Sequence, residues 1–246
     1  MTGARRERTA ERQPSFDTAA ERVPFLRALS PEDLDRLRPY AVCRRIPHGQ
    51  PIWREGDPTG EFTLVVEGQV KLVRSHEAGR EVILSICGQG ELLCASAVCS
   101  FAPYCCASLA VDEAVDVVTF PRRDVLALLE RSPEASRAFL REVTGREMSL
   151  ARRIDELSSG QVERRVTALL ARLTEQLGVA RAGEGTWIPI SLSRQDLADL
   201  CGTTVETAIR VMTRLAREGV VETRARGFLV KDRPALERIA RGDARC

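Results

Sequence analysis

The spacing of hydrophobic residues along the chain changes near Pro121. From about Val42 to Phe120, apolar and polar residues alternate in short runs, and turn residues break these runs about every ten positions. This pattern indicates antiparallel strands in a sandwich or barrel. Ahead of the strands, residues 24–37 predict two short helices, the second of which is capped by Ser30. Residues 1–20 are polar and aperiodic, so we expect a mobile arm there.

Beyond Pro121 the period becomes helical, and a long helix is predicted over residues 133–158. Two interleaved rows of its apolar residues form a coiled-coil-like seam. Glu147 interrupts the seam, and Gly145 weakens the helix there. The seam consists of Leu140, Val143, Leu150, Ile154 and Leu157. It could pack on its own domain or on a second copy of the chain. We favour a homodimer, because a long helix between two domains needs a partner to bury such a seam.

The sharpest local pattern lies in the C-terminal part. Ser193 and Asp196 predict a capped helix, and Cys201-Gly202-Thr203 predicts a tight turn before a second helix that Thr204 caps. Two short β runs follow, over residues 220–223 and 228–230. Helix, turn, helix and hairpin in this order indicate a winged helix-turn-helix.

Glu206 and Arg210 are four positions apart, so they point the same way from the first turns of the second helix. In a helix-turn-helix these turns enter the major groove, where Arg bridges O6 and N7 of guanine and a carboxylate accepts from cytosine. The alternative is an ordinary surface ion pair. We expect base reading by Val205, Glu206, Ile209 and Arg210. We expect contacts with the DNA backbone from Arg194, Gln195, Thr203, Thr204, Arg214, Arg217, Arg224 and Arg226.

The distribution of charge supports a polyanionic partner for the C-terminal part. The net charge of the chain is +2, but residues 1–160 carry 22 basic and 24 acidic side chains, whereas residues 161–246 carry 15 and 11. The two parts therefore differ in sign, at −2 and +4. Among the 37 basic residues, all but Lys71 and Lys231 are arginine.

Composition also narrows the class of protein. Hydrophobic residues make up 43% and charged residues 29%, as in globular proteins. No apolar run approaches the roughly 20 residues of a membrane helix, and no signal peptide is recognisable. We therefore expect a cytoplasmic protein without a membrane partner, whose eight cysteines stay reduced. Two histidines and no familiar catalytic motif argue against an enzyme; a thiol oxidoreductase using Cys105 and Cys106 is the one form left.

Residues 193–219, especially Val205-Glu206-Thr207 followed by Arg210, closely resemble the recognition region of Crp–Fnr transcription regulators. Upstream, the turns at Glu55-Gly56-Asp57 and Glu67-Gly68-Gln69-Val70 look like those of that family's cyclic-nucleotide-binding-type β-roll. The resemblance implies an α+β fold with an antiparallel β-roll sensory domain, a long dimerisation helix and a C-terminal winged helix-turn-helix domain. It also implies double-stranded DNA as a partner, and RNA polymerase as another if the protein is an activator.

On this basis the chain divides into four parts. They are an arm over residues 1–20, a sensory domain over residues 21–132, a dimerisation helix over residues 133–158 and a DNA-binding domain over residues 159–240. Two positions depart from the family. Ile209 stands where many nitrate- and anaerobiosis-type members carry Ser, and Val205 stands where catabolite-activator types carry Arg. Ile209 could pack on a thymine methyl group.

In cyclic-nucleotide binders of this fold, a Gly-Glu-Leu turn holds the ribose and an Arg pairs with the phosphate. This chain keeps Gly90, Glu91 and Leu92, but Tyr104 stands at the position of that Arg. Tyr cannot neutralise a phosphate, and a buried unpaired charge is costly. The sequence therefore predicts an effector pocket formed by these four residues and argues against cyclic AMP and cyclic GMP.

Five of the eight cysteines lie within 20 residues around the expected pocket. Cys94, Cys99, Cys105 and Cys106 could bind an iron–sulfur cluster or zinc, or form a redox disulfide, although their spacing matches no standard ligand set. Haem is less favoured: the stretch from Cys94 to Cys99 resembles the thiolate haem-ligand region of the family's carbon-monoxide sensor, but Ser96 replaces its His. We favour metal or redox sensing over structural cysteines or a small organic effector. A constitutive DNA-binding protein with an empty β-roll is a further alternative.

Overall fold

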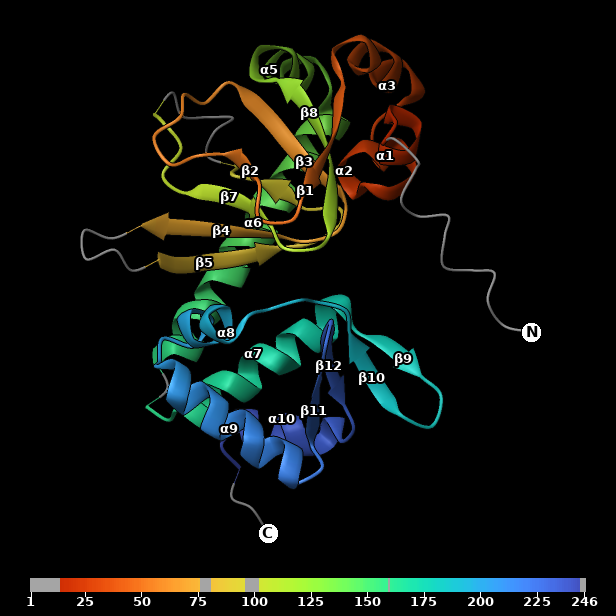
Figure 1. Cartoon of the computed structure of the whole chain (residues 1–246). Helices are drawn as coiled ribbons and strands as arrows, with labels where there is room; N and C mark the ends of the chain where they lie inside the picture. Colours follow the sequence, from red (N-terminus) through yellow and green to blue (C-terminus); the bar gives the residue numbers. More distant parts are fainter. Residues whose placement is uncertain (1–13, 76–80, 96–101, 159, 244–246) are drawn as a thin grey trace.

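The computed structural model describes residues 14–75, 81–95, 102–158 and 160–243, and Figure 1 shows two domains joined by a long helix. The first described elements are three short helices and a 3-10 turn. They are α1 (Phe16–Arg22), α2 (Pro24–Arg27), α3 (Pro31–Leu37) and η1 (Arg38–Tyr40). The predicted pair of helices over residues 24–37 is confirmed, and the hydroxyl of Ser30 accepts from the amide of Asp33 at 3.1 Å.

The predicted arm is wrong at its C-terminal end. Residues 16–20 belong to α1, where Ser15 caps the helix and Phe16 and Ala19 are buried. The ring of Phe16 meets that of Phe120 edge-on, with centroids 6.2 Å apart, so this apolar contact holds the segment against the sheet. Residues 1–13 lie outside the described part of the chain.

Eight strands form two four-stranded antiparallel sheets. One sheet has the order β1 (Val42–Pro47), β8 (Ala114–Pro121), β3 (Glu61–Glu67) and β6 (Leu92–Leu93). The other has the order β2 (Pro51–Trp53), β7 (Ala107–Ala110), β4 (Val70–Ser75) and β5 (Glu81–Cys87). The period-two pattern is therefore confirmed as a roll of antiparallel strands, and we call this part the β-roll.

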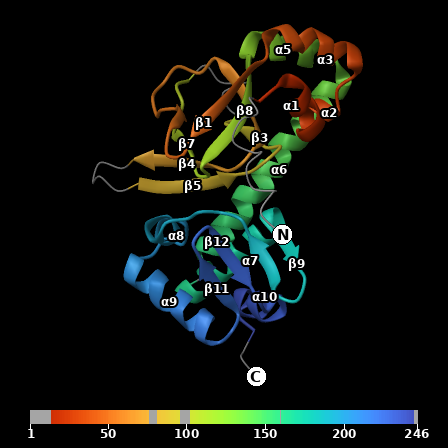
Figure 2. The same cartoon turned by 45° about the vertical axis from the view of Figure 1, so that its right-hand side comes forward.

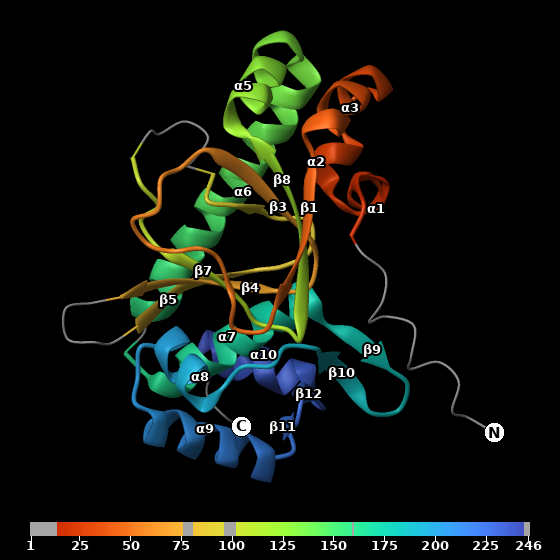
Figure 3. The ribbon, with the colours of Figure 1, turned by 45° about the horizontal axis from the view of Figure 1, so that its top comes forward.

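Strand β8 shows how the β-roll holds two cores. Val118 and Phe120 belong to an apolar cluster with the N-terminal helices, whereas Val115 and Val117 belong to the cluster between the two sheets. Since successive side chains of a strand point to opposite faces, one apolar strand serves both clusters. Figure 3 shows the helices beside the outer face of the β1–β8–β3–β6 sheet.

Helix α5 (Arg122–Arg131) leads into α6 (Pro133–Ser158), which runs along the β-roll toward the C-terminal domain in Figures 1 and 2. Its first turns are buried through Ala135, Ala138 and Phe139. The ring of Phe139 lies 6.3 Å from that of Phe62 on β3. Helix α6 is thus fixed to the outside of the β-roll at its N-terminal end.

The C-terminal domain contains more structure than the sequence patterns predicted. Its helices are α7 (Val162–Leu177), α8 (Arg194–Leu200), α9 (Val205–Arg217) and α10 (Arg233–Arg241). Its sheet has the order β11 (Val221–Arg224), β12 (Gly227–Val230), β10 (Gly185–Ile188) and β9 (Val179–Arg181). Helices α7 and α10 and strands β9 and β10 complete the packing around the predicted winged helix-turn-helix, so the expected fold class is confirmed. None of the described helices combines the length and apolar character that a membrane crossing requires.

We predict that Gly90→Ala lowers the stability of the β-roll more than Gly49→Ala does. Both glycines have a positive φ, +88° and +71°, so alanine is strained at either position. A Cβ atom on Gly90 would also lie 2.7 Å from Cδ of Pro24 at the start of α2, whereas a Cβ atom on Gly49 meets open space. Thermal unfolding should show an extra loss of about 1–3 kcal/mol for Gly90→Ala. Equal losses for the two variants would contradict the close approach of α2 to this turn.

Candidate DNA interface and sensory pocket

Two capped helices build the candidate DNA interface. The hydroxyl of Ser193 accepts from the amide of Asp196 at 3.0 Å, and the Asp196 carboxylate accepts from the amide of Ser193 at 2.9 Å, which completes the capping box of α8. Gly202 takes φ +57° in the turn, a left-handed conformation that favours glycine. The hydroxyl of Thr204 then caps α9 by accepting from the amide of Thr207 at 3.3 Å.

Helix α9 has one apolar and one solvent-exposed face. The buried face consists of Ala208, Val211, Met212 and Leu215. Of the four residues expected to read bases, Glu206 and Arg210 are exposed in the first two turns, whereas Val205 and Ile209 are half-buried. The amide of Glu206 and the hydroxyl of Thr204 lower the pKa of the Glu206 carboxyl. It is therefore an ionised acceptor at neutral pH.

The residues expected to contact the DNA backbone lie on α8, on the turn, on α9 and on the β11–β12 hairpin. Arg194, Gln195, Thr204, Arg217 and Arg226 are exposed, whereas Thr203, Arg214 and Arg224 are half-buried.

Three of these arginines already have carboxylate partners. Arg224 donates to Glu184 and Glu222, each at 3.0 Å, Arg214 pairs with Glu163, and Arg226 pairs with Glu113 of the β-roll. Solvent-exposed ion pairs contribute about 0–1 kcal/mol, so a DNA phosphate can replace the exposed Glu113 partner of Arg226 at little cost.

The four residues expected to form the effector pocket do not surround one cavity. Leu92 is buried in the cluster with the N-terminal helices, and Gly90 lies against Pro24. Tyr104 is buried between the two sheets, where it stacks on Trp53 with ring centroids 4.3 Å apart. Trp53 in turn donates to the carbonyl of Cys106 at 2.9 Å. A large aromatic pair therefore fills part of the β-roll interior, which sequence spacing alone does not reveal.

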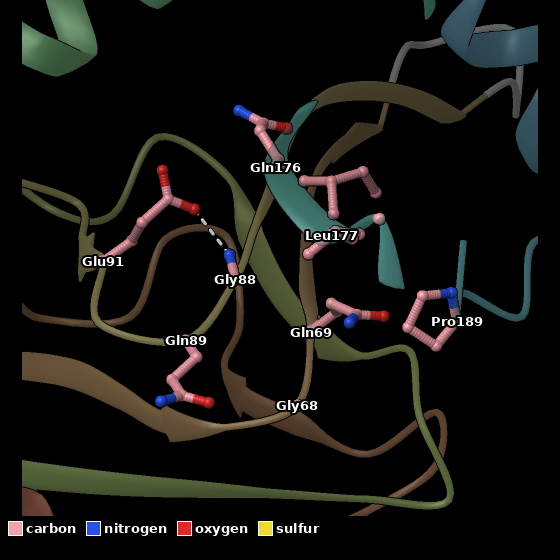
Figure 4. A pocket seen from close by; sticks show the side chains of 10 residues that line it. Gly68, Gln69, Gly88, Gln89, Glu91, Gln176, Leu177 and Pro189 are labelled. Atoms are coloured by element: carbon pink, nitrogen blue, oxygen red, sulfur yellow. Dashed lines mark hydrogen bonds between the residues drawn. The ribbon is translucent and has the colours of Figure 1, made fainter. Parts of the chain in front are cut away.

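Glu91 instead lines a cavity between the two domains (Figure 4). The cavity has a volume of about 470 Å³. The β-roll contributes Gly68, Gln69, Ile86, Gly88, Gln89 and Glu91, and the C-terminal domain contributes Gln176, Leu177, Gly178 and Pro189. Protein surrounds much of the Glu91 carboxyl and raises its pKa by removing water, although its hydrogen bond from the amide of Gly88 favours the ionised form. Among the described residues that line it are one carboxylate, three amides and no basic side chain, a set that does not suit a phosphate.

Sequence reasoning missed Arg146 on α6, because its neighbours in space are more than 50 positions away. Its guanidinium donates to the carbonyl of Leu92 at 2.9 Å and lies 3.5 Å from Sγ of Cys87. The one available signal is a row of residues seven apart, Phe139, Arg146 and Arg153, beside the seam. Arg153 continues this contact, donating to the carbonyl of Ile83 at 3.3 Å. The row therefore fastens α6 to β5 and β6.

The cysteines differ in exposure. Cys105 is exposed, whereas Cys94 and Cys106 are buried. Burial, with the neighbouring thiols of Cys105 and Cys94, raises the pKa of Cys106 to about 12. Cys94 has φ +51°, a left-handed conformation that is uncommon for residues other than glycine. Cys99 lies outside the described residues, and within them no group of three His, Cys, Asp or Glu side chains could hold a metal ion.

An apolar stripe on α6 is exposed to solvent. Leu140, Leu150, Ile154 and Leu157 keep between 41% and 67% of their surface accessible, and Val143 is half-buried. These are the residues of the predicted seam, and they extend over about 26 Å of helix. The β-roll and the C-terminal domain therefore leave this face uncovered.

Comparison with known families matches residues 164–239 to the Crp-like helix-turn-helix domain and residues 43–132 to the cyclic nucleotide-binding domain. The cyclic AMP receptor protein of Thermus thermophilus is 31% identical over 219 residues, which cover 89% of this chain and 97% of that protein. The nitrogen fixation regulation protein FixK of Bradyrhizobium diazoefficiens is 29% identical, with 85% and 87% covered.

Solved structures support the same architecture. FixK2 from Bradyrhizobium japonicum superimposes with a TM-score of 0.72 at 21% identity, covering 84% of this chain and 98% of that one. A transcriptional regulator of the CRP family from Thermus thermophilus, TTHB099, gives a TM-score of 0.69 at 25% identity, with 82% and 97% covered.

Proposed function

Because the chain belongs to the Crp–Fnr family of DNA-binding transcription regulators, we propose that it acts as a homodimer whose two α9 helices read an inverted repeat. The observation that carries this proposal is the pair Glu206 and Arg210, exposed together on the first turns of a helix capped by Thr204. A chain of this family is a regulator, and its relatives named above are regulators rather than enzymes.

The proposed readout follows from the chemistry of the two exposed side chains. The guanidinium of Arg210 would donate to O6 and N7 of guanine, and the carboxylate of Glu206 would accept from the amino group of cytosine. Val205 and Ile209 are half-buried, so they would offer apolar contact, for which a thymine methyl group is a suitable partner. Arg194, Gln195, Thr203, Thr204, Arg214, Arg217, Arg224 and Arg226 would hold the phosphates and add affinity without sequence information.

The proposed dimer is supported by the uncovered stripe on α6. Four exposed apolar side chains along one helix face are costly in water, and a two-fold pairing of α6 with its copy would bury them. Such a pairing relates the two α9 helices by the same axis, and each α9 then faces one half-site. RNA polymerase would be a further partner if the regulator activates transcription.

For the signal, we propose oxidation that begins at Cys105. A peroxide would oxidise the Cys105 thiolate to a sulfenic acid and release hydroxide; condensation with the thiol of Cys94 or Cys106 would then form a disulfide and release water. Cys105 is exposed, and the high pKa of Cys106 leaves that thiol a poor first nucleophile at neutral pH. A disulfide here would pull on the segment whose carbonyl holds Trp53.

The described residues do not fit a cyclic nucleotide inside the β-roll, although several relatives are named for cyclic AMP. Tyr104 occupies the interior with Trp53, and the guanidinium of Arg146 is engaged by the carbonyl of Leu92. A metal or haem in place of the disulfide would require Cys99 or a rearrangement of the thiols. A small organic effector and constitutive DNA binding are the alternatives that would be left if the experiment on the cysteines eliminates the thiol signal.

We predict that Arg210→Ala loses about 1–3 kcal/mol of binding free energy on the specific site and relaxes the preference at one G·C pair per half-site. Arg217→Ala, at the exposed C-terminal end of the same helix, should weaken binding evenly across sequences. Fluorescence anisotropy with specific and random duplexes at fixed salt measures both effects. Equal losses on the two duplexes for Arg210→Ala would refute the base contact.

We predict that Leu150→Asp yields folded monomers, because the change places a charge in the apolar seam. Arg152→Asp, an exposed position on the opposite side of α6, should leave the dimer intact. Analytical ultracentrifugation gives the masses, and circular dichroism checks the fold. A wild-type protein that is monomeric at micromolar concentration would exclude the proposed dimer.

We predict that hydrogen peroxide changes the affinity of the wild type for its operator and that dithiothreitol reverses the change. The double variant Cys94→Ser and Cys105→Ser should lose this response and keep its fold, since Ser is nearly the same size as Cys. Cys43→Ser, outside the cluster, is the control, and mass spectrometry of alkylated peptides should find Cys105 labelled ahead of Cys94 and Cys106. An unchanged response in the double variant, or no response in the wild type, would eliminate the thiol signal.

A further inference from the structure

The β-roll and the C-terminal domain share one apolar cluster. Val73, Ile83 and Ile86 of strands β4 and β5 belong to the same buried cluster as Leu197 and Leu200 of α8. Helix α8 lies against β5 on one side and against α9 on the other (Figures 1 and 3). The helix that precedes the recognition helix is therefore also the helix that meets the sensory sheet.

One ion pair crosses this interface in a largely buried position. Nζ of Lys71 on β4 lies 2.6 Å from the carboxylate of Asp196 on α8, and the two side chains are 19% and 15% exposed. Asp196 is also the residue that completes the capping box with Ser193. Burial alone would raise the pKa of Asp196, but Lys71 and the two donors of Ser193 outweigh it and lower that pKa, so the carboxylate stays charged.

The pair joins strand β4 to helix α8 and so lies between α6 on one side and α9 on the other. The β-roll end of the link is fastened to α6, because Arg146 and Arg153 donate to carbonyls on β6 and β5. The other end is the first turn of α8, which packs on α9. This contact therefore contributes to the orientation of α9 relative to α6, beside the buried ion pair of Arg172 on α7 with Glu156 on α6.

A second ion pair joins the domains at the far side, between Arg226 and Glu113, but its side chains are 74% and 77% exposed. Exposed pairs hold geometry weakly, since water and salt replace either partner. The pair of Lys71 and Asp196 is more constrained, because its neighbours exclude most water and the Asp196 carboxylate also accepts two hydrogen bonds from Ser193.

We propose that Lys71, a residue of the sensory sheet, is a positioning residue for DNA reading: through Asp196 it sets the distance between the two recognition helices and hence the accepted half-site spacing. This rests on the proposed homodimer, since a distance between two α9 helices exists only in a dimer. Lys71 does not touch DNA. It acts by holding α8, and with it α9, at one orientation to the dimerisation helix.

The test compares Lys71→Met with Lys231→Met, the other lysine of the chain, which pairs with Glu222 inside the C-terminal domain. An inverted-repeat duplex is first selected from random DNA, and its two half-sites are then moved closer or farther apart in single base-pair steps. The ratio of affinities for the selected and the shifted duplexes is the spacing selectivity. A single half-site duplex and the melting temperature serve as controls for base reading and folding.

We expect the spacing selectivity of Lys71→Met to fall by about tenfold, with single half-site affinity unchanged. Lys231→Met should keep the wild-type selectivity, and Lys71→Arg, which keeps the charge, should restore much of it. Asp196→Asn keeps an oxygen for the cap of α8 and should reproduce the effect of Lys71→Met. The role of the ion pair can therefore still be tested if one of the two variants fails to fold.

A Lys71→Met protein with wild-type spacing selectivity would overturn the role of Lys71 while leaving the dimeric readout in place. A wild type that ignores spacing altogether would overturn the dimeric readout itself, and this inference with it.

Discussion

Helix α6 has two neighbouring rows of side chains, and each row needs a different partner. The row of Phe139, Arg146 and Arg153 is satisfied by the β-roll, through a ring contact and two hydrogen bonds to carbonyls. The row that includes Leu150 and Leu157 is left in water by the monomer. Both rows lie on the same helix. A partner that covers the apolar row would therefore also determine the position of the β-roll relative to that partner. The placement of the β-roll relative to the exposed apolar row therefore depends on this one helix.

The interior of the β-roll is packed with aromatic and sulfur-containing side chains. Trp53 and Tyr104 stack within it, and Cys94 and Cys106 pack into the same cluster. These aromatic rings and thiols fill part of the interior between the two sheets. Among the described residues, the thiol of Cys105 is exposed, and a cavity lined by Glu91 and three glutamines lies between the domains.

The C-terminal domain keeps several of its basic side chains in use before any DNA arrives. Arg214 and Arg224 pair with carboxylates of the same domain, whereas Arg226 pairs with Glu113 of the β-roll. Glu206 and Arg210, by contrast, project into solvent from a helix held by its cap and its apolar face. The surface thus separates the two exposed side chains of α9 from arginines that are already paired with carboxylates of the protein.

The amino-acid sequence by itself determined the features that arise within a few residues. The capping box of Ser193 and Asp196, the glycine turn at Gly202, the two faces of α9 and the seam of α6 all follow from local spacing, since caps and helical periods act over three to seven positions. The helix α1 was missed because a short segment with one buried aromatic residue carries little periodicity. Tertiary structure alone decided that Tyr104 stacks on Trp53, that Arg146 reaches Leu92, and that Lys71 meets Asp196 across 125 positions. Such contacts depend on how two domains pack, and packing sums many weak apolar contacts that no local pattern records.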